Sequence, residues 1–297
     1  MKDVPMACAD PPIDPVNEHD VRPAVKDLVA QNRVSIDKVK AILEKHPLFD
    51  YSNKHDDLWI LRFCLSHKKK TKDAVKAAEH TLAFRQEHKL DEQDIRFHGV
   101  TKGTANLPTA LARYMEQCSE DGLQWALPDP KRGVISFLNY GGLDQHGLVK
   151  NLDEKDWLPA YLHLSEWTHQ WLDYTTRVTG RLTKSVRLID CAEVKLSGIS
   201  QECTKRDGAA LGAMEDFYPQ VLQTLYLCHA PSWVQVPWRI LRPLLPKRVV
   251  EKIDFINPDK KEKERKRLLE HLDEAHLPVR FGGKHEPWPV VFPLPPH

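Results

Sequence analysis

The sequence lacks a long apolar run and an excess of charge of either sign. No stretch of its 297 residues approaches the roughly 18 apolar residues that a membrane span needs. Residues 1–15 carry no apolar segment behind Lys2, so we expect neither an integral membrane protein nor one secreted by a standard signal. The 43 basic and 42 acidic residues give a net charge of +1, which excludes a wholesale attraction to nucleic acid.

Cysteine is sparse, and no two cysteines are close in the sequence. The six are Cys8, Cys64, Cys118, Cys191, Cys203 and Cys228. Without a C-x-x-C pair, neither a zinc ribbon nor a thioredoxin motif is available. Cys64 and Cys228 lie in apolar stretches, where cysteine behaves as a small core hydrophobe. We therefore expect free thiols in a cytoplasmic protein.

The motifs of common enzyme classes are also missing. The sequence has no G-x-S-x-G elbow, no P-loop lysine motif and no G-x-G-x-x-G dinucleotide loop. We predict that the protein is not an enzyme and requires no cofactor.

Two groups of residues are candidates for a metal or haem. His163, Glu166 and His169 are spaced three apart, so successive members share a helix face, as metal ligands would. The spacing differs from that of zinc proteases, and we predict a solvated, aromatic-flanked helix face with no metal. The residues that could ligate haem are Tyr226, Cys228 and His229. No haem attachment motif accompanies them.

The overall composition is that of a folded protein. Hydrophobic residues make up 41% and charged residues 29% of the chain, with a mean hydropathy of −0.51. The length favours one main core with a helical accessory piece. Prolines gather at both ends, so we expect residues 1–23 and 285–297 to be extended.

Helical patterns dominate the first part of the chain. The predicted helices cover residues 35–46, 57–66, 72–88 and 107–118. Ser35 can cap the first helix, and Asp56 or Asp57 can cap the second. The first three helices would form a small bundle.

Strands and helices alternate in the second part. The predicted strands lie at residues 133–140 and 185–190 and within 221–230 and 252–256, and the predicted helices cover residues 156–179, about 209–218, and 259–276. This alternation predicts an α/β fold whose strands are joined by helical crossovers.

Residues 232–245 form a short segment that is apolar nearly all round. A helix of this kind must be buried or must meet an apolar medium. The segment is too short to span a membrane, but it could lie in an interface or roof an apolar cavity. An ordinary buried helix explains the periodicity equally well.

Three ordered motifs resemble the CRAL-TRIO family, the lipid-binding fold of phosphatidylinositol and phosphatidylcholine transfer proteins. Leu61, Arg62 and Phe63 stand in the family's familiar order, and Arg85 stands where an arginine closes the next helix. The sequence from residue 217 to 255 is similar to the family's tyrosine, proline, strand and gate-helix order. Residues 277–284, LPVRFGGK, look like its terminal double-glycine string. The resemblance covers roughly residues 56–284.

The resemblance implies an N-terminal helical bundle followed by a lobe whose mixed β-sheet floors a hydrophobic pocket closed by a gate helix. The corresponding regions are an extended segment at 1–23, the helical region at 24–103, the lipid-binding lobe at 104–284 and a proline-rich tail at 285–297. The apolar residues expected on the gate are Trp233, Val234, Trp238, Ile240, Leu241, Leu244 and Leu245.

The implied function is that of a carrier that takes one phospholipid or similar hydrophobic ligand from a membrane. Burying an acyl chain gains about 0.8 kcal/mol per CH₂, so a long lipid leaves a bilayer very slowly unless an apolar cavity receives it. Such a carrier would be a cytoplasmic monomer that contacts membranes peripherally. The alternatives are a membrane-sensing scaffold that presents lipid to an enzyme, and a carrier of an isoprenoid or haem.

The sequence departs from the family at the head-group positions. His67, Gln220 and Lys252 stand where phosphatidylinositol-binding members have a basic residue, a glutamate and a lysine. His67 is largely neutral near pH 7 at its ordinary pKa of about 6.5, and Gln220 cannot form an ion pair. We therefore expect phosphatidylinositol to be a poor ligand.

Ser185 and Arg187 stand at the positions of the hydroxyls that contact phosphatidylcholine. An arginine directed into a lipid pocket is costly unless an anionic partner meets it, so Arg187 could select an acidic head group. Lys68, close to His67, is a further head-group candidate. Together with Lys247 and the basic run from Lys260 to Arg267, Lys68 could also attract anionic lipid. The alternative for the basic run is a helix face that is exposed to solvent.

Overall fold

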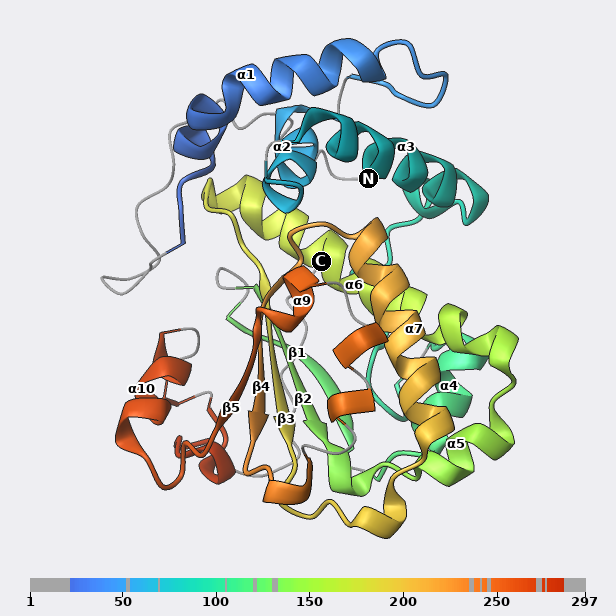
Figure 1. Ribbon diagram of the computed structural model, residues 1–297, viewed down its shortest axis with the longest axis vertical. Coiled ribbons are helices and arrows are strands. Elements are labelled where there is room, and N and C mark those ends of the chain that lie inside the picture. The colour runs from blue at the N-terminus through green and yellow to red at the C-terminus, as the bar shows by residue number, and fades with distance from the viewer. Residues whose placement is uncertain are drawn as a thin grey trace.

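A computed structural model describes residues 22–51, 54–68, 70–104, 106–119, 122–129, 133–234, 238–240, 242–244, 247–270, 274–275 and 277–285. Three helices lie at one end of it, and a five-stranded sheet flanked by further helices forms the rest (Figure 1). Nearly all of the two ends that we expect to be extended, residues 1–23 and 285–297, lies outside the described residues.

The N-terminal region is helical, as predicted. It contains helices α1 (Val25–Leu43), α2 (Asp57–Ser66) and α3 (Thr71–Glu87). Asp56 caps α2 by accepting a 3.0 Å hydrogen bond from the backbone N–H of Trp59. The predicted start of the first helix at Ser35 is wrong, because α1 begins ten residues earlier. Its buried Val25 packs with Leu58, so tertiary contact extends the helix past the Ser35 signal.

The sheet is mixed, as predicted. Its strands are β1 (Leu123–Asp129), β2 (Gly133–Asn139), β3 (Ser185–Asp190), β4 (Leu222–Cys228) and β5 (Ile253–Ile256), and they lie side by side in chain order. β1 pairs with β2 antiparallel, and the other pairs are parallel. The predicted strands are confirmed, but β1 was not predicted. It contains Pro128, which cannot donate a ladder hydrogen bond and is tolerated here because β1 is an edge strand.

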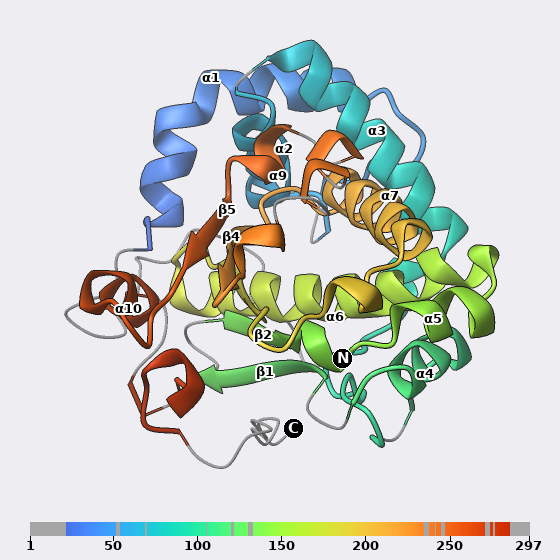
Figure 2. The same ribbon diagram turned by 60° about the horizontal axis from the view of Figure 1, so that its bottom comes forward.

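The two faces of the sheet have different neighbours. Side chains alternate along β3, so Val186 and Leu188 lie on one face and Arg187 and Ile189 on the other. The first face packs into a buried cluster with Leu268, Leu277 and Phe281 from the C-terminal part of the chain. The second face turns toward helices α6 and α7 (Figure 2).

The helices of the lobe are α4 (Thr109–Glu116), α5 (Gln145–Asn151), α6 (Glu154–Thr179), α7 (Gln201–Phe217), α9 (Lys247–Val250) and α10 (Glu262–Leu269). The long helix predicted at 156–179 is confirmed as α6. α7 begins earlier than the predicted residue 209, because Ser200 caps it by accepting a hydrogen bond from the Cys203 N–H. α5 was not predicted. α10 is shorter than the predicted 259–276, and residues 271–273 and 276 lie outside the described chain.

Buried ion pairs join the N-terminal helices to α6. The pairs are Arg62–Asp173 at 3.3 Å, Arg177–Asp56 at 2.6 Å and Arg85–Glu166 at 3.0 Å. Two of these arginines, Arg62 and Arg85, belong to the N-terminal motif of the sequence. They fix the bundle against the lobe and do not face the sheet's pocket side.

Candidate functional site

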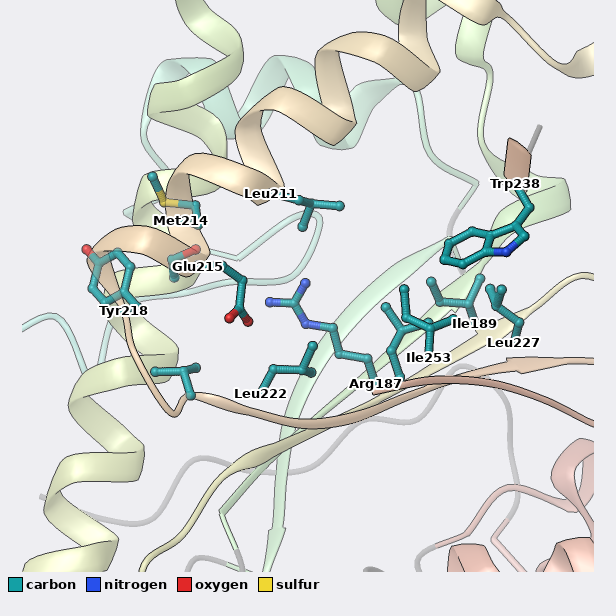
Figure 3. Close-up of a pocket in the computed structure, with 13 residues that line it drawn as sticks. Arg187, Ile189, Leu211, Met214, Glu215, Tyr218, Leu222, Leu227, Trp238 and Ile253 are labelled. Atoms are coloured by element: carbon teal, nitrogen blue, oxygen red, sulfur yellow. The ribbon is translucent and has the colours of Figure 1, made fainter. Parts of the chain in front are cut away.

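A cavity of about 110 Å³ lies between the sheet and α7 (Figure 3). Leu211, Met214, Glu215 and Tyr218, at the end of α7 and just beyond it, supply one wall, with positions spaced three or four apart as on one helix face. The strand side chains that floor it are Arg187, Ile189, Leu222, Leu225, Leu227 and Ile253. Most of the lining is therefore apolar.

Strand register explains why these side chains meet. Arg187 pairs with Leu225, and Leu225 pairs in turn with Ile253. Ile189 pairs with Leu227 one pleat further along. Because alternate residues point to the same face, these two rows form a continuous floor.

Trp238 covers the floor at one end of the cavity. Figure 3 shows its ring beside Ile189, Leu227 and Ile253, and the ring lies 6.0 Å from that of Phe255 in an edge-on arrangement. An aromatic ring in such a position removes a large apolar surface from water.

The expected gate helix is described only in part. Residues 232–234 and 242–244 form 3₁₀ turns, and residues 238–240 are helical. Val234 is buried, and Trp233 and Ile240 are half-buried. Leu241, Leu245 and the side chain of Leu244 lie outside the described residues. Pro243 lies in the second 3₁₀ turn, where the N–H group that proline lacks is not needed for a helical hydrogen bond.

Arg187 brings a charge into this apolar setting. Figure 3 shows its guanidinium directed at the carboxylate of Glu215 across the cavity. Burial lowers the pKa of Arg187, and the negative charge of Glu215 opposes that shift. The guanidinium is ionised in any case, and the carboxylate of Glu215 offsets part of the cost of burying its charge.

Two lysines approach the same carboxylate. The Nζ of Lys252 lies 3.9 Å from a carboxylate oxygen of Glu215. Burial, together with the positive charges of Lys252 and Arg62, lowers the pKa of Lys184 to about 8, and Glu215 opposes this shift. Of these cations, only Arg187 lines the cavity together with Glu215.

The other predicted head-group residues lie near this end but make contacts of their own. Gln220, in a left-handed backbone conformation, donates a 3.1 Å hydrogen bond to the hydroxyl of Ser66. His67 follows as the C-cap of α2 and is half-buried, and Lys68 is exposed. The hydroxyl of fully buried Ser185 donates to the Val221 carbonyl at 3.1 Å.

Glu215 and Lys184 were not among the residues predicted from the sequence. A glutamate on a helix is ordinarily solvated, and only the packing of α7 on the sheet turns Glu215 inward. Lys184 directly precedes β3, and its proximity to Lys252 depends on strand pairing.

The predicted solvated helix face at His163, Glu166 and His169 is wrong, because the packing of α3 on α6 buries Glu166 and leaves the two histidines half-buried. Glu166 accepts hydrogen bonds from Arg85 at 3.0 and 3.2 Å and from the Tyr218 hydroxyl at 2.8 Å. Burial lowers the pKa of His163 and of His169. Within the described ranges, no group of three histidine, cysteine, aspartate or glutamate side chains is arranged to hold a metal.

The residues considered for haem do not line the cavity. Tyr226 and Cys228 alternate with the cavity-lining Leu225 and Leu227 and pack on the opposite face of β4. His229 contacts Asp190 at 2.8 Å through Nδ1. A haem held by these three residues would therefore not occupy this cavity.

The basic run near the C-terminus is engaged in ion pairs. Arg265 contacts Glu262 at 2.9 Å and Glu274 at 2.7 Å. Lys261 contacts Glu264 at 3.0 Å. These contacts match a solvated helix face better than a concentrated positive patch. None of the helices in the described ranges is long and apolar enough to cross a membrane.

Comparison with known proteins identifies a family and several relatives. A family model described as CRAL/TRIO domain matches residues 123–283. The chain is 22% identical over 263 residues to the SEC14 cytosolic factor of Eremothecium gossypii, covering 88% of this chain and 79% of that protein. It is 24% identical over 252 residues to the SEC14 cytosolic factor of Kluyveromyces lactis, covering 84% and 78%.

The chain is also similar to a relative from an insect and to a solved structure. The chain is 22% identical over 206 residues to Protein real-time of Aedes aegypti, covering 67% of this chain and 29% of that protein. The crystal structure of Sfh5 matches with a TM-score of 0.47 at 14% identity, covering 84% of each chain.

Proposed function

The chain belongs to the CRAL/TRIO domain family of lipid-binding proteins, and we propose that it carries one hydrophobic ligand in the cavity between the sheet and α7. The observation that supports this most strongly is the apolar lining, with Trp238 across one end. Each CH₂ moved from water into such a lining gains about 0.8 kcal/mol, so binding a lipid here requires no covalent chemistry.

The cavity must enlarge to accept a lipid. Its volume of about 110 Å³ is below the roughly 300 to 1,000 Å³ typical of pockets for drug-sized ligands. The segment bearing Trp238 lies between β4 and β5 and is the covering element that can move without breaking a strand pair. We assign to residues 232–245 the role of a gate that opens at a membrane surface.

The gate also carries charge suited to that surface. Arg239, Arg242 and Lys247 are exposed in and just after the gate. A basic residue near an anionic membrane contributes about 1 kcal/mol of attraction. Apolar side chains with exposed cations beside them fit a peripheral, reversible contact with membranes.

Phosphatidylinositol should be a poor ligand. Lys252 keeps its charge, but it lies beside Glu215, while His67 and Gln220 provide no fixed charge. A charge-assisted contact is worth about 1.5 to 3 kcal/mol, so the missing cation at His67 lowers affinity roughly tenfold to a hundredfold.

One loading experiment tests both the carrier function and its selectivity. Purified protein is incubated with vesicles that contain equimolar phosphatidylcholine and phosphatidylinositol, then repurified and extracted. We expect about one lipid per chain, mostly phosphatidylcholine. Protein that retains no lipid would contradict the carrier function. Preferential loading with phosphatidylinositol that Lys252→Ala abolishes would contradict the selectivity.

A further inference from the structure

Ser165 is a buried polar residue in the lining of the cavity. It belongs to α6, is only 7% exposed, and lies among side chains that are mostly apolar. Buried hydroxyl groups ordinarily form a hydrogen bond within the protein. Within the described ranges, no residue forms a hydrogen bond with the hydroxyl of Ser165. Its hydrogen-bonding capacity is therefore available to a molecule that enters the cavity.

Two threonines of the same helix show the ordinary arrangement. Thr168 donates to the carbonyl of Leu164 at 2.7 Å, and Thr176 donates to the carbonyl of Leu172 at 2.6 Å. Both threonines are fully buried, and each closes onto the carbonyl four residues earlier, as hydroxyl groups in helices commonly do. Ser165 makes no such bond to the described part of the helix. Its hydroxyl is thus left for a partner outside the chain.

Ser165 lies at the end of the cavity opposite Trp238. The residue that follows it, Glu166, accepts a 2.8 Å hydrogen bond from the hydroxyl of Tyr218. Figure 3 shows Tyr218 and Trp238 at opposite ends of the lining. A molecule that enters past Trp238 would therefore reach Ser165 last. The hydroxyl of Tyr218 is already engaged by Glu166, so it does not compete for that molecule.

The charged side chains of the lining compensate each other. Figure 3 shows the guanidinium of Arg187 directed at the carboxylate of Glu215. Within the described lining, no third side chain carries a charge. A charged ligand would be buried here without a counterion of its own, which is unfavourable. The cavity therefore favours a ligand without charge.

We propose that the cavity selects an uncharged lipid with a single hydroxyl group, which binds with that hydroxyl inward on Ser165 and its chain extended toward Trp238. This proposal rests on the carrier function proposed above and specifies the ligand class. A serine hydroxyl both donates and accepts, so it replaces a hydrogen bond that the ligand hydroxyl loses on leaving water. The leucine, isoleucine and methionine side chains of the lining receive the chain.

A competition among lipids that share one chain tests the proposal. Phosphatidylcholine vesicles contain equal amounts of oleyl alcohol, the hydrocarbon of the same chain, and oleyl sulfate, which is an anion. The full-length protein is incubated with them and repurified, and its lipids are extracted and quantified by mass spectrometry. The ratio of alcohol to hydrocarbon on the protein reports the hydrogen bond. The ratio of alcohol to sulfate reports the preference for an uncharged group.

We expect the wild type to load more alcohol than sulfate. Ser165→Ala should lower the ratio of alcohol to hydrocarbon roughly threefold to tenfold, the range for one neutral hydrogen bond. The variant should load the hydrocarbon as the wild type does, because alanine keeps the cavity apolar at that point. Ser197→Ala makes the same change at an exposed serine outside the cavity, and this matched control should behave as the wild type.

Three results would overturn the proposal. The first is a folded Ser165→Ala protein whose ratio of alcohol to hydrocarbon does not fall below that of the wild type. The second is a wild type that loads more sulfate than alcohol. The third is retention of phosphatidylcholine alone, which would refute the ligand class while leaving the carrier function intact. Retention of no lipid would instead refute the carrier function and this proposal together.

Discussion

Arg85 and Glu166 illustrate how single residues hold this protein together. Both side chains are buried, and they form two hydrogen bonds of 3.0 and 3.2 Å between α3 and α6. Burial by itself would raise the pKa of Glu166, but the charges of Arg85 and His169 lower it. Arg85 is therefore the main group that keeps Glu166 ionised in the core.

Removal of that arginine should be strongly destabilising. We expect Arg85→Met to reduce the free energy of unfolding by about 3 to 5 kcal/mol, because it leaves a buried carboxylate without its cation. Denaturant unfolding at pH 7 measures the loss. Arg113→Met breaks an exposed contact of 3.4 Å with Asp156 and should cost less than about 1 kcal/mol. Equal losses in the two variants would contradict the assigned role of Arg85.

At the scale of elements, the proposed gate between β4 and β5 differs in structure from the strands beside it. Strands β4 and β5 are held by ladder hydrogen bonds, whereas the described parts of residues 232–245 are short helical turns. Among the described residues of this segment, Trp238 contacts the ring of Phe255 and packs on the floor. Opening of the proposed gate would leave the ladder hydrogen bonds of β4 and β5 intact.

A charge on the gate should impair transfer more than folding. We expect Trp238→Glu to slow vesicle-to-vesicle transfer of fluorescent phosphatidylcholine at least tenfold, because burial of one large apolar side chain is worth about 1.5 to 3 kcal/mol. Trp238→Phe keeps an aromatic ring and should transfer at close to the wild-type rate. A folded Trp238→Glu protein with full transfer activity would rule out the gate.

The sequence indicated some elements well and others not at all. The apolar runs of β3 and β4 and the periodicity of α6 are local signals, and each element lies where it was predicted. β1 carries polar residues and Pro128, and its pairing with β2 stabilises it, so its own residues gave no signal. The start of α1 likewise depends on contacts of Val25 with the lobe.

The sequence singled out some residues that lie in or near the cavity, but it did not predict how they are arranged. Arg187 and Lys252 could be singled out from their places in a family pattern. Glu215 could not, because its inward direction depends on how α7 packs against the sheet. The assembly of Arg187, Lys184, Lys252 and Glu215 depends on pairing between strands far apart in sequence, which local patterns do not encode.

At the scale of the whole molecule, we propose separate roles for the ion-paired helices and for the gate at residues 232–245. Ion pairs fix α2 and α3 to α6, and α6 and α7 in turn face the sheet. Opening at Trp238 can therefore enlarge the cavity while α6, α7 and the sheet stay in place. A cavity of about 110 Å³ in the closed protein is therefore compatible with a lipid carrier, because opening of the proposed gate enlarges it.

Native mass spectrometry of the purified full-length protein tests the central claim most directly. After incubation with phosphatidylcholine vesicles, we predict a species whose mass exceeds that of the chain by one hydrophobic molecule, identified by extraction. Collisional activation should release that molecule and leave the bare chain. A protein that shows only the mass of its bare chain, both as purified and after incubation with lipid, would contradict the account.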